Sequence, residues 1–219
     1  MVKKSHNTGR SPGVRISRSR IQRRFRLKRI LAIYGSPRKE GTTSVLFAAA
    51  VRGARDRGAE VEEVFLRDLK ISPCLEIYAC RKTGRCVIKD DFEPLHDKLL
   101  ECDALMLASP IFFYTVSAHT KIFMDRCQAL WAKKYLIDKA PFGLRQPARK
   151  GLFLSAGATK GSKLFDGVLI SMKYLFDTLD MELSKTLLYR GLESPEDLDR
   201  HPAYLEEAYR GGGEFAGGL

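Results

Sequence analysis

The segment IYGSPRKEGTTSVL, residues 33–46, places hydroxyl groups and one arginine between an apolar run and a helical pattern. A phosphate bound there would meet unpaired backbone N–H groups and the positive end of the helix dipole. Gly35 and Gly41 would allow the backbone to turn tightly before the helix. The side chains expected to contact such a phosphate are Ser36, Arg38, Thr42, Thr43 and Ser44.

The spacing of this loop separates it from two common phosphate-binding motifs. It shows neither the G-x-G-x-x-G of dinucleotide folds nor the G-x-x-x-x-G-K-S/T of nucleotide triphosphatases. A hydroxyl-rich loop without an obligate lysine suits a phosphate monoester such as that of FMN. The alternative is an ordinary strand-to-helix turn in which Thr42 or Thr43 caps the helix. The loop alone leaves both interpretations open.

Two later loops match the demands of a flavin ring. The apolar run 104–108 is followed by SPIFFYTVSA, and the run 152–156 leads into SAGATKGS, residues 155–162. In a doubly wound sheet, ligands bind beyond the carboxyl ends of the strands, so these loops should converge on the first one. Aromatic clusters belong more often to the core, but isoalloxazine also needs an apolar surface and nearby backbone N–H groups. The residues expected to line the ring are Pro110, Ile111, Phe112, Phe113, Ser155, Ala156 and Gly157.

Three cysteines form a second candidate site in a predicted loop. Cys74, Cys80 and Cys86 are the candidate metal ligands, and two aspartates follow them. An iron–sulfur cluster normally takes four thiolates, so a cluster here would need an outside ligand. Zinc with His96 as a fourth ligand is an alternative, although the spacing matches no standard zinc motif. The third interpretation is a loop that holds no metal.

The rest of the chain predicts the elements that position these loops. Short apolar runs alternate with longer helical patterns, which is typical of successive βα units around a parallel sheet. Strands are expected at 30–34, 61–66, 104–108, 152–156 and 182–189, and helices near 43–57, 91–101, 117–131, 162–179 and 195–209. Gly58 should close the first helix. Cys102 and Cys127 are expected to be buried, whereas His96 and His119 are expected to be solvated or to cap helices.

Charge divides the chain into unequal parts. Eleven of the 38 Lys and Arg residues lie in residues 1–29, which contain no acid, so the rest of the chain is nearly neutral despite the net charge of +12. Residues 1–28 are therefore predicted to be a basic disordered tail, 29–210 one folded domain, and 211–219 a flexible C-terminal tail. The basic segment has two further interpretations. It resembles an organelle transit peptide, or it is an artefact of start assignment if translation begins at Leu27. Nucleic-acid binding is disfavoured because no stacking aromatics interrupt the basic residues.

Composition also bounds the location of the protein. No run approaches the roughly 20 apolar residues of a membrane-spanning helix, and no secretory signal is evident. The cysteine count of five is odd, so a disulfide framework is not expected. These observations favour a protein of the cytoplasm with reduced thiols and no membrane partner.

Three segments together resemble the NADPH-dependent FMN reductase and iron–sulfur flavoprotein family. They are GSPRKEGTTSVL, ISPCLEIYACRKTGRC and DDFEPLHDKLLECDALMLASPIFFYTVSAHTKIFMDR, and the likeness extends over residues 28–210. The resemblance implies an α/β, flavodoxin-like three-layer fold with a five-stranded parallel sheet. It also implies noncovalent FMN, and a homodimer or homotetramer that completes the flavin site. By motif position, Ser36, Arg38, Thr43 and Ser44 would hold the phosphate, and residues 110–113 would line the ring.

The chain departs from the family pattern at two places. The usual Asn-Thr pair is Thr42-Thr43 here, and Ile77 stands where iron–sulfur members carry the second of four cysteines. An iron–sulfur cluster is therefore disfavoured. The function implied is an FMN-dependent NAD(P)H oxidoreductase that passes electrons to a small-molecule acceptor such as a quinone or flavin. The alternative is an electron carrier of flavodoxin or iron–sulfur flavoprotein type. No catalytic acid or base is predicted, since the chemistry belongs to the flavin.

Overall fold

A computed structural model describes residues 27–146 and 148–219. One parallel sheet with the strand order β2-β1-β3-β4-β5 forms the centre of this part of the chain. Its strands are β1 (Arg29–Tyr34), β2 (Glu60–Phe65), β3 (Ala104–Pro110), β4 (Arg149–Gly157) and β5 (Met181–Arg190). All five lie where the sequence predicts strands. The strand order reverses between β1 and β3, which is where such sheets bind ligands.

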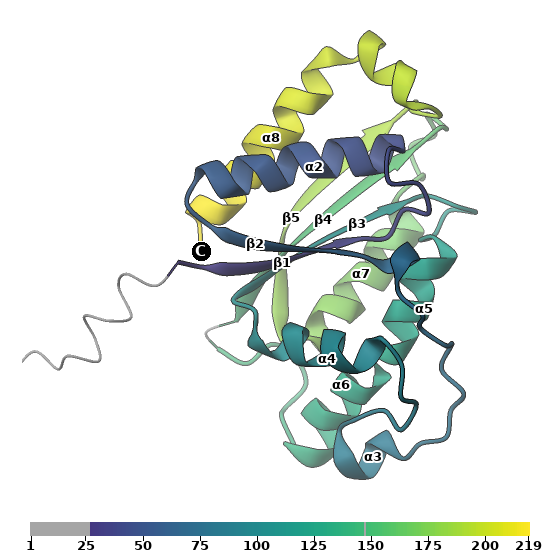
Figure 1. Cartoon of the computed structure of the whole chain (residues 1–219), viewed down its shortest axis with the longest axis vertical. Coiled ribbons are helices and arrows are strands. Elements are labelled where there is room, and N and C mark those ends of the chain that lie inside the picture. The colour runs from purple at the N-terminus through teal and green to yellow at the C-terminus, as the bar shows by residue number, and fades with distance from the viewer. Residues whose placement is uncertain (1–26, 147) are drawn as a thin grey trace, which may run out of the picture.

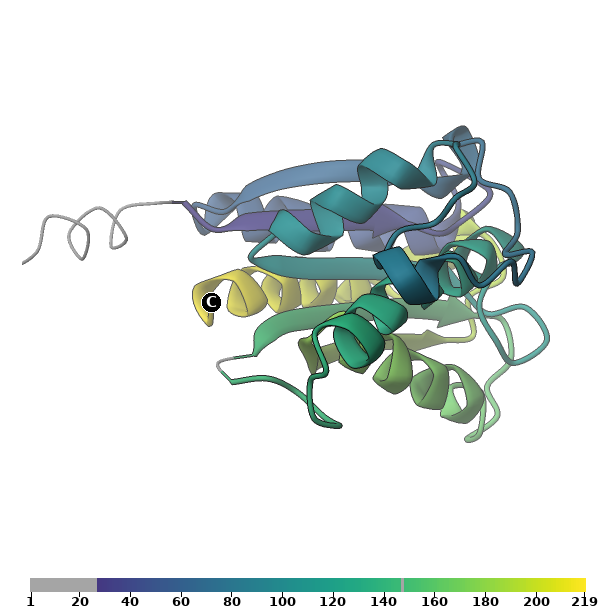
Figure 2. The ribbon, with the colours of Figure 1, turned by 90° about the horizontal axis from the view of Figure 1, so that it is seen from below.

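Helices cover both faces of the sheet. Figure 1 shows α2 (Thr42–Asp56) and α8 (Pro202–Gly217) together on one face. The other face carries α4 (Phe92–Glu101), α5 (Ala118–Arg126), α6 (Gln128–Ala132) and α7 (Asp166–Thr178). In Figure 2 this second group lies in front of the strands, with α2 and α8 behind them. Short helical turns are η1 (Leu66–Asp68), α3 (Cys80–Thr83), η2 (Lys133–Ile137) and η3 (Pro195–Arg200). The predicted flavodoxin-like three-layer fold is confirmed.

The alternation of side chains along β1 builds both layers at once. Ile30, Ala32 and Tyr34 pack in the core beneath α2 and α8. Leu31 and Ile33 point the other way, into the core shared with α4, α5 and α7. A strand buried on both faces reads as a continuous apolar run, which is why the sequence identifies it so clearly.

The helix predicted at 117–131 is interrupted. The structure has α5 and α6 in its place, and the chain then continues as the π-helical turn η2. The helix predicted at 195–209 begins as η3 and continues as α8. Gly58 follows the end of α2 with a φ of 84°, which confirms it as the terminating glycine.

The prediction of a flexible tail at 211–219 is wrong, because α8 continues to Gly217. Gly211, Gly212 and Gly213 are buried. A Cβ atom on Gly212 would lie 1.9 Å from the carbonyl oxygen of Ala50 on α2. The glycine run therefore lets two helices approach closely.

The basic segment lies almost wholly in residues 1–26, outside the described part of the chain. No helix in the described part is long and apolar enough to span a membrane.

Candidate flavin site

The loops after β1, β3 and β4 converge at the carboxyl edge of the sheet, as predicted. They surround a cavity of about 280 Å³, hereafter the strand-end cleft. Nine of the predicted flavin-site residues line it: Ser36, Arg38, Thr42, Thr43, Pro110, Ile111, Phe112, Ala156 and Gly157. The sequence therefore located the cleft and most of its wall.

The segment after β5 also contributes to the strand-end cleft, which the sequence analysis missed. Leu192 and Glu193 line the cleft, and the Leu192 N–H donates to the Gly157 carbonyl oxygen at 3.2 Å. The signal was available, because the carboxyl end of every parallel strand reaches the same edge of the sheet. The loop GLES, residues 191–194, begins two positions after the end of the last predicted strand.

The first turn of α2 presents unpaired donors to the strand-end cleft. Its N-cap residue is Gly41, with no side-chain cap, so the alternative in which Thr42 or Thr43 caps the helix is wrong. Within the described residues, no protein acceptor takes the backbone N–H groups of Thr42 and Thr43. The Thr42 hydroxyl is buried and has no partner there either. Buried polar groups normally find partners, so this arrangement fits an anion bound at the helix end.

Ser36 and Ser44 use their hydroxyls to shape the loop. Both donate to the carbonyl oxygen of Arg38, at 3.0 and 2.8 Å respectively. The Ser36 oxygen also accepts from the Arg38 N–H at 3.2 Å. Ser44 does not line the strand-end cleft, whereas the exposed Arg38 does. The two serines thus hold the turn that presents Arg38 to the cleft.

A buried set of hydroxyls ties three strand ends together. The Ser117 hydroxyl donates to the Gly35 carbonyl oxygen, and the Ser117 N–H donates to the Ser109 hydroxyl at 3.0 Å. The Ser155 hydroxyl donates to the Ser109 carbonyl oxygen at 2.7 Å. Ser155 is fully buried and does not line the strand-end cleft. Its side chain therefore fixes the position of β4 against β3 rather than facing a ligand.

The aromatic loop after β3 is a tight turn. Phe112 and Thr115 exchange backbone hydrogen bonds of 2.9 and 3.0 Å. Phe113 and Tyr114 between them have φ values of 49° and 61°, which bulky side chains rarely adopt. Phe112 lines the strand-end cleft, but Phe113 is fully exposed and does not. The predicted shelf therefore consists of Pro110, Ile111 and Phe112.

Residues 28–166, more than half of the chain, match the model of a family described as NADPH-dependent FMN reductase. The chain belongs to the NADPH-dependent FMN reductase family. An iron–sulfur flavoprotein of Methanocaldococcus jannaschii is 37% identical over 102 residues, 47% of this chain and 53% of that protein. A Bacillus subtilis protein named as an NAD(P)H-dependent FMN-containing oxidoreductase is 26% identical over 83% of this chain and 95% of its own. The chain spans about half the length of the first iron–sulfur flavoproteins it matches.

Solved structures share the fold of this family member at low sequence identity. An NAD(P)H:quinone oxidoreductase from Methanothermobacter marburgensis superposes with a TM-score of 0.63 at 16% identity. The match covers 86% of this chain and 96% of that one. An azoreductase from Bacillus anthracis gives 0.62 at 16% identity, over 86% and 100%. Both likenesses support the fold alone.

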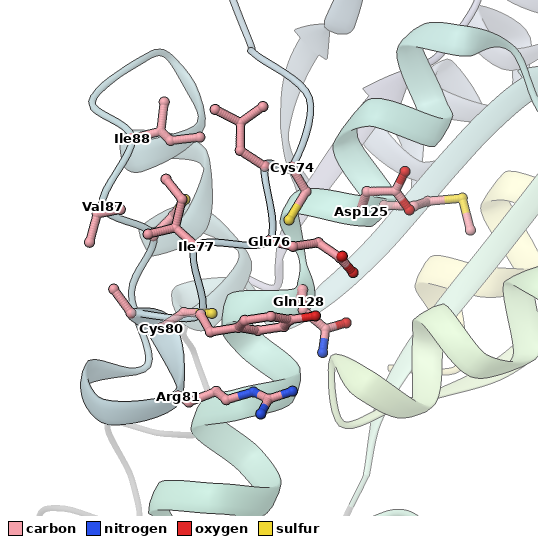
Figure 3. Close-up of a pocket in the computed structure, with 14 residues that line it drawn as sticks. Cys74, Glu76, Ile77, Cys80, Arg81, Val87, Ile88, Asp125 and Gln128 are labelled. Atoms are coloured by element: carbon pink, nitrogen blue, oxygen red, sulfur yellow. The ribbon is translucent and has the colours of Figure 1, made fainter.

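The three candidate metal ligands surround a second and larger cavity, of about 500 Å³, hereafter the thiol pocket. Figure 3 shows the loop that carries Cys74 and Cys80 facing the helical segment of Asp125 and Gln128. Cys86 lines the same pocket, and all three cysteines are partly exposed free thiols. Cys74 and Cys86 lie in irregular segments between β2 and α4, as predicted, whereas Cys80 begins the short helix α3.

Protein contacts hold the thiol pocket in place. The Arg126 guanidinium, almost fully buried, forms a salt bridge with Asp90 at 2.6 Å and donates to the carbonyl oxygens of Ser72 and Ile88. Burial opposes ionisation of Asp90, but hydrogen bonds from Arg126 and from backbone N–H groups hold its pKa below the ordinary value. The loop is thereby tied to α5 at both ends of the cysteine segment.

His96 is buried, so the prediction of a solvated or capping role is wrong. One ring nitrogen, Nε2, lies 3.2 Å from the Gly84 carbonyl oxygen, and burial lowers the pKa of the ring. A neutral imidazole with an Nε2 proton would donate to Gly84. His96 thus braces the turn after α3 instead of offering a nitrogen to the cysteines.

The thiol pocket does not fit a four-thiolate cluster. Ile77 has no donor atom and lines the pocket, as do Leu75 and Val87. In the described part of the chain, no group of three or more His, Cys, Asp or Glu side chains is arranged to hold a metal ion. The described lining therefore offers three thiols, and an isoleucine stands at the position of the fourth.

Proposed function

We propose that this chain is an FMN-dependent NAD(P)H oxidoreductase with FMN bound in the strand-end cleft. The observation that carries the proposal is the buried, unpartnered Thr42 hydroxyl at an uncapped helix N-terminus. A phosphate monoester would satisfy it together with the N–H groups of Thr42 and Thr43. The family membership and the position of the cleft at the switch point support the same assignment.

Each loop of the strand-end cleft has a distinct role in this proposal. Thr42, Thr43 and Arg38 bind the phosphate, while Ser36 and Ser44 keep the loop in shape and present Arg38. Pro110, Ile111 and Phe112 provide an apolar surface for the ring. Ala156 and Gly157 bring backbone close to it, because they carry little or no side chain.

When bound, FMN would supply the redox chemistry between NAD(P)H and a second substrate, and residues of the strand-end cleft would hold it. The chain contributes binding, orientation and exclusion of water from one face of the ring. Among the described residues of the strand-end cleft, Glu193 is the one carboxylate. We assign it no proton-transfer role. The second substrate is proposed to be a small acceptor such as a quinone or a flavin.

A second copy of the chain is proposed to complete the site as a homodimer or homotetramer. The volume of the strand-end cleft is slightly below the roughly 300–1,000 Å³ usual for ligand sites, so part of a bound flavin would extend beyond it. The exposed Phe113 and Tyr114 border the cleft wall formed by Phe112 and could cover that part from a neighbouring copy.

Five free thiols agree with the proposed cytoplasmic location.

The test is to titrate FMN into the purified full chain, followed by flavin fluorescence, and then to add NAD(P)H and a quinone. We expect saturable binding, steady NAD(P)H oxidation, and weaker binding in the Ser36→Ala, Thr43→Ala double variant. A chain that binds no FMN, or a double variant with unchanged affinity, would refute the proposed site. Binding without steady NAD(P)H oxidation would favour the electron carrier instead.

A further inference from the structure

One wall of the strand-end cleft has no role in holding either the phosphate or the ring. This wall is the segment after β5, where Leu192 and Glu193 line the cleft. Both residues lie beyond residues 28–166, which match the family model. Glu193 is the one carboxylate among the described lining residues, at a site otherwise built for an anion. A carboxylate repels a phosphate, so Glu193 requires a different group as its partner.

The segment that carries Glu193 is anchored toward both ends of the strand-end cleft. On the ring side, the Leu192 N–H donates to the Gly157 carbonyl oxygen at 3.2 Å. On the phosphate side, η3 follows directly and lies against α2, whose first turn holds the unpartnered Thr42 hydroxyl. A ligand that reaches from the phosphate loop to the ring wall would therefore pass Glu193.

Buried Asp197 fixes the backbone of this segment. One oxygen of its carboxylate accepts from the N–H groups of Glu193 and Ser194, at 2.7 and 3.0 Å. The other oxygen pairs with Arg200, and Asp197 itself is only 5% exposed. Ser194 and Asp197 also form a capping box at the start of η3. The fold thus sets the position of Glu193, although its side chain is exposed.

Acceptors for the hydroxyl groups of a ligand are scarce in the rest of the strand-end cleft. Several backbone carbonyl oxygens of the lining already accept hydrogen bonds of 2.8–3.3 Å within the protein, namely those of Arg38, Pro110, Phe112, Ala156 and Gly157. The groups at the start of α2 are donors, which suit a phosphate. By contrast, no described donor occupies the two carboxylate oxygens of Glu193, which act only as acceptors.

We propose that the Glu193 carboxylate binds the hydroxyl groups of the ribityl chain of FMN, with Asp197 as its positioning residue. This inference rests on the FMN site proposed above. The chain hydroxyls donate to the carboxylate oxygens, while Thr42 and Thr43 hold the phosphate. A hydrogen bond from a hydroxyl to a carboxylate is stronger than one to a neutral acceptor. Glu193 therefore selects a flavin whose polyol chain is intact.

The experiment compares FMN with an analogue that keeps the ring and the phosphate but has hydrogen in place of the ribityl hydroxyls. The measured quantity is the ratio of the two dissociation constants, analogue over FMN, from fluorescence titrations of the full chain. The native chain should bind the analogue more weakly than FMN. Glu193→Ala should reduce the ratio about tenfold, because hydrogen bonds to a charged group are lost. Removing a charge near the phosphate affects both flavins alike and cancels in the ratio.

Glu196→Ala is the matched control, because Glu196 is an exposed acid of the same segment that does not line the strand-end cleft. This variant should keep the native ratio. Glu193→Gln retains one acceptor oxygen and should recover part of it. A native ratio in Glu193→Ala, or an equal fall in Glu196→Ala, would overturn the role of Glu193 while leaving the FMN site intact. A native chain that binds neither flavin would refute the FMN site and this inference with it.

Discussion

The Ser117 hydroxyl donates a hydrogen bond to the carbonyl oxygen of Gly35, although 82 positions separate the two residues in the chain. Ser117 is also the N-cap of α5, and its oxygen accepts from the Thr120 N–H at 3.2 Å. Gly35 cannot carry a side chain, because a Cβ atom there would lie 1.9 Å from the Thr120 hydroxyl oxygen. One serine thus joins the phosphate-loop turn to the helix after β3.

Ser117→Ala should lower the free energy of unfolding by about 1–2 kcal/mol, because it removes a helix cap and leaves the Gly35 carbonyl with only the long 3.5 Å hydrogen bond from the Thr120 hydroxyl. FMN affinity should fall as well, since the loop loses its tie to α5. Urea unfolding and FMN titration measure the two effects. Ser171→Ala is the control, because the half-buried Ser171 hydroxyl donates only within its own helix α7, to the Gly167 carbonyl oxygen, and this change should affect neither quantity. Equal losses in both variants would contradict the role given to Ser117.

Thr42→Val removes the unpartnered hydroxyl while keeping the shape of the side chain. Without FMN, the free energy of unfolding should stay the same or rise, because a buried hydroxyl without a partner is costly. With FMN, the dissociation constant should rise about tenfold, the equivalent of roughly 1.4 kcal/mol for a hydrogen bond to a charged group. Thr83→Val in α3 is the control. An equal loss of FMN affinity in that variant would contradict a specific role of the Thr42 hydroxyl in binding the phosphate.

Gly212→Ala should destabilise the protein by about 2–3 kcal/mol, since the new methyl group would collide with the carbonyl of Ala50. Gly217→Ala is a matched change on the same helix, where an added Cβ meets nothing within 4 Å. Its effect should be neutral or slightly stabilising. Thermal or urea unfolding of both variants checks the pair. Similar stabilities would show that α8 does not pack against α2 as described.

Phe113→Asn should raise the free energy of unfolding of the isolated chain by about 1 kcal/mol. Asparagine tolerates the left-handed conformation at this turn position, and the exposed phenylalanine ring loses no packing. The measurement is urea unfolding at two protein concentrations. A gain that shrinks as the protein concentration rises is expected if Phe113 also contacts the second copy proposed above, whereas a variant that is less stable at both concentrations would contradict the strain assigned to this turn.

Asp90→Asn should destabilise the protein at neutral pH and lose its effect in acid. The folded pKa of Asp90 is depressed, so the ionised carboxylate contributes stability above the ordinary carboxyl range. That contribution disappears as the pH falls through the folded pKa. The difference in free energy of unfolding between the native chain and Asp90→Asn, measured against pH, should therefore shrink on acidification. A constant difference would contradict the ion pair with Arg126.

The pattern of residue types determined the sheet, the order of its elements and most of the strand-end cleft. Apolar runs such as 104–108 mark strands buried on both faces, and parallel strands bring their carboxyl ends to one edge. From this rule alone, Thr42, Phe112 and Gly157 could be placed together. Local sequence also identified Ile77 as a residue that supplies no metal ligand.

Tertiary structure alone decided which side chains face the cleft and which glycines are packed. Ser155 turns into the sheet and Phe113 into solvent, because neighbouring strands and a strained turn fix their directions. Gly212 and Gly213 of α8 are buried because Ala50 and Gly53 of α2 approach them, a contact between residues about 160 positions apart. Local sequence carries no trace of such contacts, since a glycine run has the same composition whether it is free or packed.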